Sequence, residues 1–529
     1  MSETTNTANR QIARAAGTVM LAFIISQLTG LARSILVART FGAGAELSAF
    51  IAANRVSETL FTLLAGGVLS SAFIPTFTTF LTRNDKKSAW RLASAVANLI
   101  TIILGVLAAL AAVFAPEISR YLLVPGFADD PSLLKLTVEL LRIQLGSAVI
   151  FALGGLVMGI LNAHQVFFIP ALTPALYQLG LIFGVLVLAP GMGIYGLAYG
   201  VLIGSSLYLL LQAPTLIKHG ARYSLILGRD MPAAAEVLRL MGPRIFGAAI
   251  VQLNFWVNIW LGSQMPDKGS VASLSYGFAL MMMAEGAIAQ SIAIAAMPTL
   301  SAQYALGKLD DLRASLAASL RGVILLALPA ALGLILFRIP IISLLYQRGE
   351  FDAHSTQLVA WALLWYASGL IFHSVLEVLA RSYYAMHDTK TPVLVGAIAM
   401  GINVGLSFVF VALFNRIGWM PHGGLALANS LATALETTTL LIIMRKRLHG
   451  IQGRVVSKGA GVAALGTLGM SAAIFIWLQA MQGFTVAIIS LGGIVIGVAI
   501  YGLILILFRL PEIQIFLHWI KRRFSKTSP

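Results

Sequence analysis

Residues 92–113 read LASAVANLITIILGVLAALAAV, a stretch of 22 residues without a charged side chain. As a helix, a stretch of this length extends for about 33 Å, which matches the hydrocarbon core of a bilayer. Apolar segments of similar or greater length recur along almost the whole chain, and we predict about fourteen membrane spans. Their approximate bounds are 12–40, 46–80, 88–115, 133–162, 167–189, 193–217, 234–263, 270–303, 312–338, 354–386, 391–414, 420–444, 457–481 and 485–509. The sequence therefore predicts an all-α, polytopic integral membrane protein.

The overall composition supports the same prediction. Of the 529 residues, 58% are hydrophobic and 11% are charged, whereas about 25% are charged in soluble domains. Because this small number of charged side chains cannot cover the surface of a soluble protein of this length, the apolar surface must face lipid. The chain has no cysteine, which excludes disulfides, thiolate zinc sites and cysteine nucleophiles.

The distribution of Lys and Arg predicts the orientation in the membrane. Residues 1–9 are polar and are not followed by a cleavage-type site, which predicts a cytoplasmic tail rather than a signal peptide. An even number of spans puts both termini on one side. The positive-inside rule assigns the basic loops near 83–91, 218–229 and 445–458, and the tail at 511–529, to the cytoplasm. We therefore attribute the net charge of +16 to membrane orientation and predict no nucleic-acid partner.

Ionisable residues inside the spans are the candidate functional groups, because each costs about 2.5–3.5 kcal/mol at a helix centre. Arg33 lies well inside the first predicted span. Arg55 and Glu58 lie three residues apart in the second span, where a local ion pair and a substrate contact are equally well supported. Arg142 lies near the predicted end of the fourth span, which favours an interfacial role at least as strongly as a central one.

Further polar groups lie in later spans. Glu377 and Arg381 are four residues apart, which predicts an ion pair on one helical face. Four neutral residues form a weak candidate cation site, since hard cations accept amide and hydroxyl oxygens. They are Asn258, Asn403, Ser407 and Asn429. No carboxylate accompanies them, so hydrogen bonds between helices are the favoured interpretation.

The sequence gives little support to an enzyme. It contains no histidine pair with metal-ligand spacing on one face, no glycine-rich loop with the Walker lysine and no recognisable Ser/His/Asp set. Long loops that would form a soluble catalytic domain are also missing. We therefore predict a transporter that uses no cofactor.

Seven local strings, taken in order, carry a resemblance that covers nearly all of the chain. They are SQLTGLARSILVARTFGAG (26–44), LAGGVLSSAFIPTF (64–77), GILNAHQVFFIPALTPALY from 159, MGPRIFGAAIVQLNFWVN from 241, AMPTLSAQYA from 296, LLYQRGEFDAHST from 344 and EVLARSYYAMHDTKTPV from 377. This ordered set resembles the MurJ/MviN family of lipid II flippases. The resemblance implies the fourteen-helix fold of the multidrug/oligosaccharidyl-lipid/polysaccharide exporter superfamily. The implied parts are a cytoplasmic tail (1–9), two six-helix lobes (10–218 and 219–447), two additional helices (448–510) and a basic cytoplasmic tail (511–529).

The resemblance also implies an activity and a set of binding residues. The activity is the transfer of lipid II, the undecaprenyl-diphosphate-linked peptidoglycan precursor, from the cytoplasmic to the outer leaflet of the bacterial inner membrane by alternating access. Membrane lipids and the peptidoglycan synthesis machinery are the implied further partners. Arg33 is the foremost candidate for a diphosphate contact, because a guanidinium binds phosphate oxygens with a planar fork. Four further candidates are Arg55, Gln27, Ser26 and Arg142.

Three positions depart from the family pattern. Gln27 and Ala279 stand where the family pattern has an arginine, and Phe61 stands where some members carry one. A cavity with fewer arginines holds a diphosphate less tightly, so either neighbouring groups compensate or the substrate differs. Another undecaprenyl-diphosphate-linked glycan, a multidrug (MATE-like) export activity and a non-transporting scaffold therefore remain open. The family's sodium-site positions fall on the four residues of the weak candidate cation site, which keep polarity but lose the carboxylates.

Overall fold

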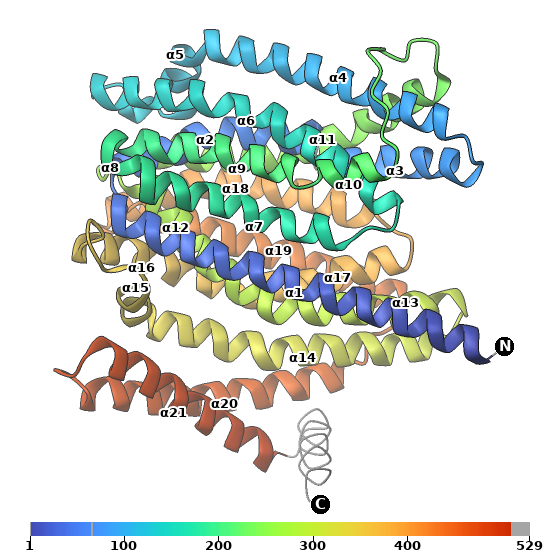
Figure 1. Ribbon diagram of the computed structural model, residues 1–529. Helices are drawn as coiled ribbons and strands as arrows, with labels where there is room; N and C mark the ends of the chain where they lie inside the picture. The colour runs from blue at the N-terminus through green and yellow to red at the C-terminus, as the bar shows by residue number, and fades with distance from the viewer. Residues whose placement is uncertain (1, 65–66, 509–529) are drawn as a thin grey trace, which may run out of the picture. The chain divides into compact units, whose positions relative to one another are not determined.

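The computed structural model describes residues 2–64 and 67–508, and these residues form helices joined by short connections (Figure 1). No strand occurs in this described part of the chain. The first half contains α1 (Ser2–Phe41), α2 (Ala45–Leu64), α3 (Gly67–Thr82), α4 (Lys86–Val113), α5 (Ala115–Glu117), η1 (Ile118–Leu123), η2 (Pro125–Phe127), α6 (Pro131–Ala163), α7 (Phe168–Phe183), η3 (Gly184–Leu188), α8 (Ala189–Met192), α9 (Ile194–Leu210), α10 (Ala213–Lys218) and α11 (Pro232–Ser263). The second half contains α12 (Ser270–Glu285), η4 (Gly286–Gln290), α13 (Ser291–Ala305), α14 (Leu309–Leu336), α15 (Arg338–Tyr346), α16 (Ala353–Ser368), α17 (Leu370–Ala385), α18 (Lys390–Arg416), α19 (His422–Arg447), α20 (Gly453–Ala480) and α21 (Val486–Leu507).

These helices confirm the predicted all-α, multi-pass membrane protein. Among the described residues, ten helices are long and apolar enough to cross a bilayer, and two bent helix pairs raise the number to 12. Helix α1 and the α2–α3 pair, which correspond to the first two predicted spans, are not in this set. Up to 12 spans from this set, together with α1 and the α2–α3 pair, are consistent with the predicted total of fourteen. The predicted tail at 511–529 lies outside the described residues.

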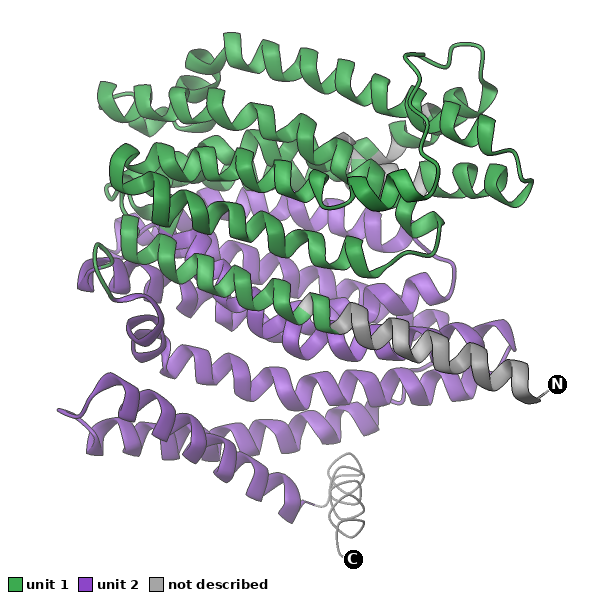
Figure 2. Cartoon of the chain, in the orientation of Figure 1, with its two compact units in different colours: residues 1–272, 348–351 green, residues 273–347, 352–529 purple. Residues whose placement is uncertain are grey.

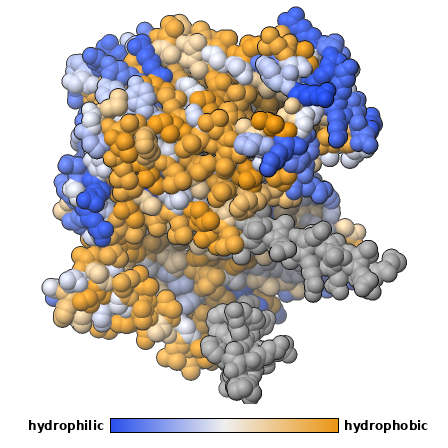
Figure 3. All heavy atoms as spheres, viewed as in Figure 1, coloured by the Kyte–Doolittle hydropathy of each residue, from blue (hydrophilic) through white to orange (hydrophobic). Residues whose placement is uncertain are grey.

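The chain divides into two compact units (Figure 2). Unit 1 comprises Met1–Ala272 and Arg348–Phe351, and unit 2 comprises Ser273–Gln347 and Asp352–Pro529. Over unit 1, the face seen in Figure 3 is mainly hydrophobic, and hydrophilic side chains gather at its two ends. On α4, for example, Val106 and Val113 expose 53% and 67% of their surface. Exposed apolar helix faces of this kind are those that a bilayer covers.

Contacts at the two ends of unit 1 show which of its connections lie together. At one end, the ring of His164, after α6, lies 5.0 Å from that of His219, after α10. The side chain of Asn98 donates to the carbonyl of Ser224 at 3.0 Å, which joins α4 to the loop before α11. At the other end, the backbone N–H of Gly126 donates to Ser263 Oγ at 3.3 Å. The connections at 164–167 and 219–231 thus meet at one end, and those at 124–130 and 264–269 meet at the other.

Glycines allow α7 and α9 to pack with their backbones in contact. Gly200 and Gly204 on α9 are four residues apart and face Gly180 on α7. A Cβ atom added at Gly180 would lie 2.2 Å from the Cα of Gly204, and one added at Gly204 would lie 2.5 Å from the carbonyl oxygen of Tyr177. In membranes, small residues at four-residue spacing commonly mediate such close approach. This packing fixes the position of Tyr177, which matters for the candidate site below.

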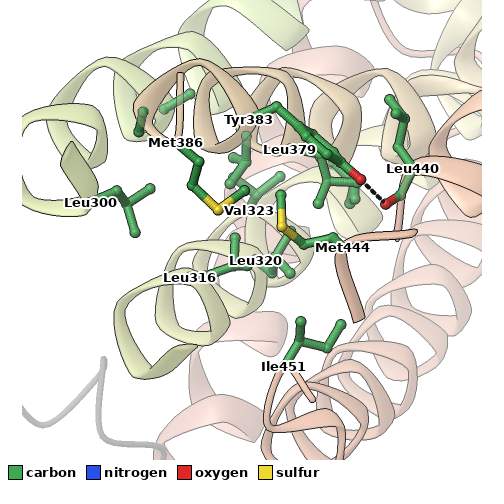
Figure 4. Close-up of a cluster of buried hydrophobic side chains, with 14 of the residues drawn as sticks. Leu300, Leu316, Leu320, Val323, Leu379, Tyr383, Met386, Leu440, Met444 and Ile451 are labelled. Atoms are coloured by element: carbon green, nitrogen blue, oxygen red, sulfur yellow. Dashed lines mark hydrogen bonds between the residues drawn. The ribbon is translucent and has the colours of Figure 1, made fainter. Parts of the chain in front are cut away.

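Unit 2 has its own apolar core between α13, α14, α17 and α19 (Figure 4). Leu316 and Leu320 of α14 pack there against Leu379 of α17 and Met444 of α19. The buried Tyr383 hydroxyl donates to the carbonyl of Leu440 at 2.8 Å, so this polar group does not remain unpaired inside the core.

An aromatic cluster lies at one end of unit 2, where α16 meets the connection between α18 and α19. The rings of Trp361 and Trp365 are 5.6 Å apart, and that of Trp419 lies 5.5 Å from Trp361. Phe414 completes the cluster at 5.1 Å from Trp419. Tryptophan and tyrosine are enriched at membrane–water interfaces, so this cluster is typical of a helix end at the level of the lipid headgroups.

The connection between α17 and α18 is fastened to the end of α19 by a carboxylate. Asp388 accepts hydrogen bonds from the hydroxyl of Thr391 at 2.6 Å and from its backbone N–H at 3.0 Å, and it forms an ion pair with Arg447. These interactions, led by the hydrogen bond from the Thr391 side chain, lower the pKa of Asp388 to about 2. The carboxyl is 13% exposed, so the interactions are only partly screened by solvent.

We expect Asp388→Asn to reduce the free energy of unfolding by about 2 kcal/mol at pH 7, because the interactions that lower the pKa of Asp388 to about 2 stabilise the folded state by roughly this amount. A carboxylate with a depressed pKa stabilises the folded state fully above its unfolded pKa of about 3.9. That stabilisation is lost as the pH falls from there through about 2. The measurement is unfolding of the detergent-solubilised protein between pH 7 and pH 2. The exposed Asp311 on α14 supplies the control variant Asp311→Asn. If Asp388→Asn remained as much less stable than the unsubstituted protein at pH 2 as at pH 7, the proposed role of the Asp388 carboxylate would be contradicted.

Candidate functional site

Helix α1, which carries Arg33, packs against α7, and Gly30, three residues before Arg33, lies beside Gln178 of α7. The Arg33 side chain is half-buried, and its Nε is buried without a hydrogen-bond partner among the described residues. Gln178 Oε1 is likewise buried and unpaired. Unpaired polar atoms cost free energy when water or a ligand does not reach them. This region of α1 and α7 is therefore suited to a polar ligand or to water.

Arg55 on α2 forms the ion pair that its spacing predicts. Its Nη1 lies 2.8 Å from Glu58 Oε2, and the guanidinium lies 4.5 Å above the ring of Phe255 on α11. The Arg55 side chain is 21% exposed and that of Glu58 is 47% exposed. Asn54 donates to the other oxygen of Glu58 at 2.7 Å. Because the Nε of Arg55 is also buried and unpaired, part of this guanidinium's capacity to donate is unused.

Tyr177 on α7 connects these two arginines. Both Arg33 and Glu58 lie close enough to interact electrostatically with its side chain. Since Glu58 is paired with Arg55, residues from α1, α2 and α7 meet in one region. We call Arg33, Arg55, Glu58 and Tyr177 the arginine cluster. Its formal charge is +1, which suits an anionic group better than an organic cation.

Helix α11 adds a polar and aromatic edge beside α2. Trp256 Nε1 donates to the Thr59 hydroxyl at 2.9 Å, and Thr59 donates to Gln252 Oε1 at 3.3 Å. Phe255 lies against Arg55, as described above. Neither these residues nor Tyr177 were among the sequence-based candidates. They carry no charge, and the string QLNFWVN alone does not indicate which of its side chains face α2.

The other α1 candidates lie on different faces of the helix. Ser26 precedes Arg33 by seven residues, which is two turns, so the two share a face. Gln27 is about 120° around the helix from Arg33, and its side chain is exposed. Ser26 is therefore better placed than Gln27 to contact the same ligand as Arg33.

Two of the positions that depart from the family pattern hold apolar residues. Phe61 packs its ring 5.5 Å from that of Phe151 on α6, which in turn lies 4.8 Å from Tyr177. An aromatic contact thus occupies the place of a charge beside the arginine cluster. Ala279 is an exposed residue of α12 in unit 2.

Arg142 on α6 lines a separate pocket. Its Nε donates to the carbonyl of Ala112 at 3.0 Å, near the C-terminal end of α4. It faces a cavity of about 670 Å³ that Arg120 and Lys135 also line. No contact among the described residues joins Arg142 to Arg33 or Arg55. The spacing of Lys135, Glu139 and Arg142 places them on one face of α6, which is the only sequence signal for this pocket.

The four weak cation-site candidates have hydrogen-bond partners or close neighbours in the protein. Asn258, in unit 1, donates to Asn254 at 3.4 Å. In unit 2, Ser407 donates to Asn403 at 3.5 Å, and the side-chain oxygen of Asn429 lies 3.1 Å from His373 Nε2. Among the described residues, no group of three or more His, Asp or Glu side chains is arranged to hold a metal ion.

Three ionisable residues inside unit 2, Glu377, Arg381 and Glu285, have partners on neighbouring turns. Arg381 Nη2 lies 2.6 Å from Glu377 Oε1, which confirms the pair predicted from their spacing. Glu285 is buried and accepts from Gln290 at 3.3 Å across the π-helical turn η4. Glu377 and Arg381 thus form a structural ion pair, whereas the partner of Glu285 is a neutral amide.

The chain is similar in sequence to proteins named lipid II flippase MurJ. The family model described as "Lipid II flippase MurJ" matches residues 37–496. A protein named lipid II flippase MurJ from Burkholderia cenocepacia is 28% identical over 432 residues, which cover 80% of this chain and 82% of that protein. A probable lipid II flippase MurJ from Vibrio cholerae is 29% identical over 428 residues, covering 79% and 80% of the two chains.

Solved structures are similar as well. A structure of lipid II flippase MurJ in an inward closed conformation matches with a TM-score of 0.79 and 27% identity, covering 93% of this chain and 98% of that one. An inward-facing multidrug resistance MATE transporter matches with a TM-score of 0.66 at 17% identity, covering 83% and 99%. The second likeness concerns the fold alone.

Proposed function

The chain belongs to the lipid II flippase MurJ family, and from this premise we propose that it carries lipid II from the cytoplasmic to the outer leaflet of the bacterial inner membrane. The observation that carries the proposal is the arginine cluster of unit 1. It offers two partly buried guanidinium groups with unused donors inside a helical bundle that otherwise suits lipid. A diphosphate is the part of lipid II that such groups recognise.

In the proposed mechanism the protein acts as a transporter by alternating access, without a cofactor and without changing a covalent bond. Arg33 binds the diphosphate, Arg55 supports it, and Ser26, on the face of α1 that carries Arg33, donates a hydrogen bond to the head group. Gln27 lies about 120° around the helix and is not part of this set of contacts. The prenyl tail stays in the bilayer, where it needs no polar partner. An inside-negative potential favours the outward movement of an anion by about 2.3 kcal/mol per charge per 100 mV.

The ion pair between Arg55 and Glu58 gives the site a way to respond to its cargo. In the structure, Glu58 neutralises much of the charge on Arg55. An arriving phosphate competes for the same guanidinium, and Glu58 is exposed enough to be hydrated when it is displaced. The cargo-bound and cargo-free states of the site thereby stay close in free energy, so that the cargo can both bind and leave, as transport requires.

Further parts of the proposal follow the sequence. We propose two six-helix lobes at 10–218 and 219–447 and two additional helices at 448–510, with cytoplasmic termini. Membrane lipids and the peptidoglycan synthesis machinery are the proposed further partners, and no nucleic acid is among them. The four weak cation-site candidates are not proposed to bind a metal.

One specific observation supports a second candidate cargo. Phe61 packs against Phe151 beside the arginine cluster, at a position where some family members carry an arginine. Fewer positive charges favour a cargo held less tightly, such as another undecaprenyl-diphosphate-linked glycan. A MATE-like export of organic cations is less well supported, because Glu58, the clearest carboxylate of the first lobe, is paired with Arg55.

Complementation tests the proposed function. We expect the chain to restore growth to a bacterium whose own lipid II flippase is switched off, and lipid II to appear in the outer leaflet. Purified protein in liposomes should move lipid II across the bilayer without other proteins. Transfer of a different lipid-linked glycan but not lipid II would establish the second cargo, and transfer of neither would contradict both proposals.

A further inference from the structure

The pocket lined by Arg142 lies at the end of unit 1 opposite the loops at 164–167 and 219–231. We call it the α4–α6 pocket. Its lining comes from α5, η1, Ala128 and the first three turns of α6, and its volume is about 670 Å³. Arg142 links it to the end of α4 through the carbonyl of Ala112. Three of its lining side chains are cationic: Arg120, Lys135 and Arg142. Two are acidic: Glu117 and Glu139.

One of the two carboxylates is already engaged. Glu139 accepts a hydrogen bond from the hydroxyl of Tyr195 and lies 3.9 Å from Lys135 Nζ. The positive charge of Lys135 is therefore partly balanced, and the two arginines are the main sources of positive charge. With all five side chains ionised, the pocket carries a formal charge of +1.

Both guanidinium groups keep donors for a ligand. The Nε of Arg142 is bonded to the Ala112 carbonyl, which fixes the side chain at the end of α4. Its two terminal nitrogens have no acceptor among the described residues. Arg120 is exposed, and its guanidinium lies 5.7 Å from the ring of Tyr121. Two partly oriented guanidinium forks facing one cavity suit a tetrahedral oxyanion.

The pocket adjoins a surface that faces lipid. Along α4, Val106, Leu110 and Val113 expose 53%, 50% and 67% of their surface, and Phe114 exposes 53% just before the pocket begins. Tyr121, at the pocket itself, exposes 64%. An apolar strip that ends at an exposed tyrosine is typical of the transition from acyl chains to headgroups. Arg142, deeper along α6, reaches this level by extending its side chain towards the helix end.

We propose that the α4–α6 pocket binds the phosphate of a lipid headgroup, with Arg120 and Arg142 as its donors and the exposed strip of α4 beside the acyl or prenyl chain. The observations do not depend on transport, so the pocket stands apart from the proposed function. A phosphodiester of a phospholipid and the diphosphate of an undecaprenyl lipid share this chemistry. In the second case the pocket is a place where the cargo rests in the outer leaflet after leaving the arginine cluster.

Native mass spectrometry of the full-length protein in detergent tests this proposal. The probes are phosphatidylglycerol, undecaprenyl diphosphate and diacylglycerol, the last of which has acyl chains and no phosphate. The variants are Arg120→Gln and the double variant Arg120→Gln/Arg142→Gln. The matched control is Arg83→Gln/Arg229→Gln, which removes two exposed charges from the opposite end of unit 1.

We expect the double variant to weaken the tightest binding of at least one phosphate-bearing lipid tenfold or more, with no change for diacylglycerol or in the control. A loss confined to phosphatidylglycerol identifies a phospholipid site, and a loss confined to undecaprenyl diphosphate identifies a cargo site. Equal losses in the double variant and in the control, or no loss in either, would overturn the proposal. If the double variant does not fold, the result for Arg120→Gln alone tests the proposal, because among the described residues the contact of the Arg120 side chain is the one with Tyr121.

Discussion

Arg33→Ala is expected to abolish growth rescue of a flippase-depleted strain while the protein is still made and inserted. The Arg33 Nε is buried and has no partner among the described residues, so its removal takes away no hydrogen bond that this atom makes there. It does remove one of the two guanidinium groups of the arginine cluster and brings the formal charge of the cluster to zero. An anionic head group then loses its strongest attraction, and the measurement is growth together with outer-leaflet lipid II.

A control on the same helix separates this effect from a general loss of charge. Arg39 is exposed, and Arg39→Ala removes the same side chain six residues further along α1. We expect Arg39→Ala to rescue growth. Full rescue by Arg33→Ala at equal membrane abundance would remove Arg33 from the binding site and leave Arg55 as the principal candidate.

Gly204→Val is expected to prevent α7 and α9 from packing, with a loss of about 3 kcal/mol or more in stability. A Cβ atom at this position would lie 2.5 Å from the carbonyl oxygen of Tyr177, and backbone atoms cannot move aside as a flexible side chain does. Tyr177 would be displaced with its helix, so any protein that still folds should also lose activity. The measurement is the yield of monodisperse protein and its thermal unfolding in detergent.

The matched control is another glycine in the middle of a membrane helix. A Cβ atom at Gly105 on α4 would have no atom within 4 Å, so Gly105→Val should fold normally. Normal stability of Gly204→Val would mean that α7 and α9 can separate without cost, contrary to the packing described above.

The fold was largely predictable because a bilayer constrains it so strongly. A stretch such as 92–113 has no alternative to a helix in lipid, and its length fixes where the helix crosses. Bends were harder to predict. The segment predicted as one span at 354–386 is a pair of helices bent by 47° at Gly369, with α16 on one side and α17 on the other. The hydropathy of such a segment shows that it is apolar throughout. Hydropathy does not predict the angle between the two helices that the segment forms.

Ion pairs near the candidate site and in unit 2 were predictable where both charged residues lie on the same helix. The pairs Arg55–Glu58 and Glu377–Arg381 follow from spacing alone, and both were confirmed. What spacing does not give is the partner on another helix. That Tyr177 interacts electrostatically with both Arg33 and Glu58 depends on how α7 packs against its neighbours, and α7 packs against both α1 and α9. Arg142 illustrates the same limit, since its side chain points to Arg120 and the end of α4.

The aromatic cluster of unit 2 gives the protein a built-in optical reporter. Three of its eight tryptophans, Trp361, Trp365 and Trp419, have ring centres within 6 Å of one another. Indoles at such distances couple electronically and exchange excitation energy, so near-ultraviolet circular dichroism and fluorescence anisotropy depend on their mutual arrangement. Because the three rings come from α16 and from the turn before α19, a movement between these elements during a transport cycle would be visible spectroscopically without an attached label.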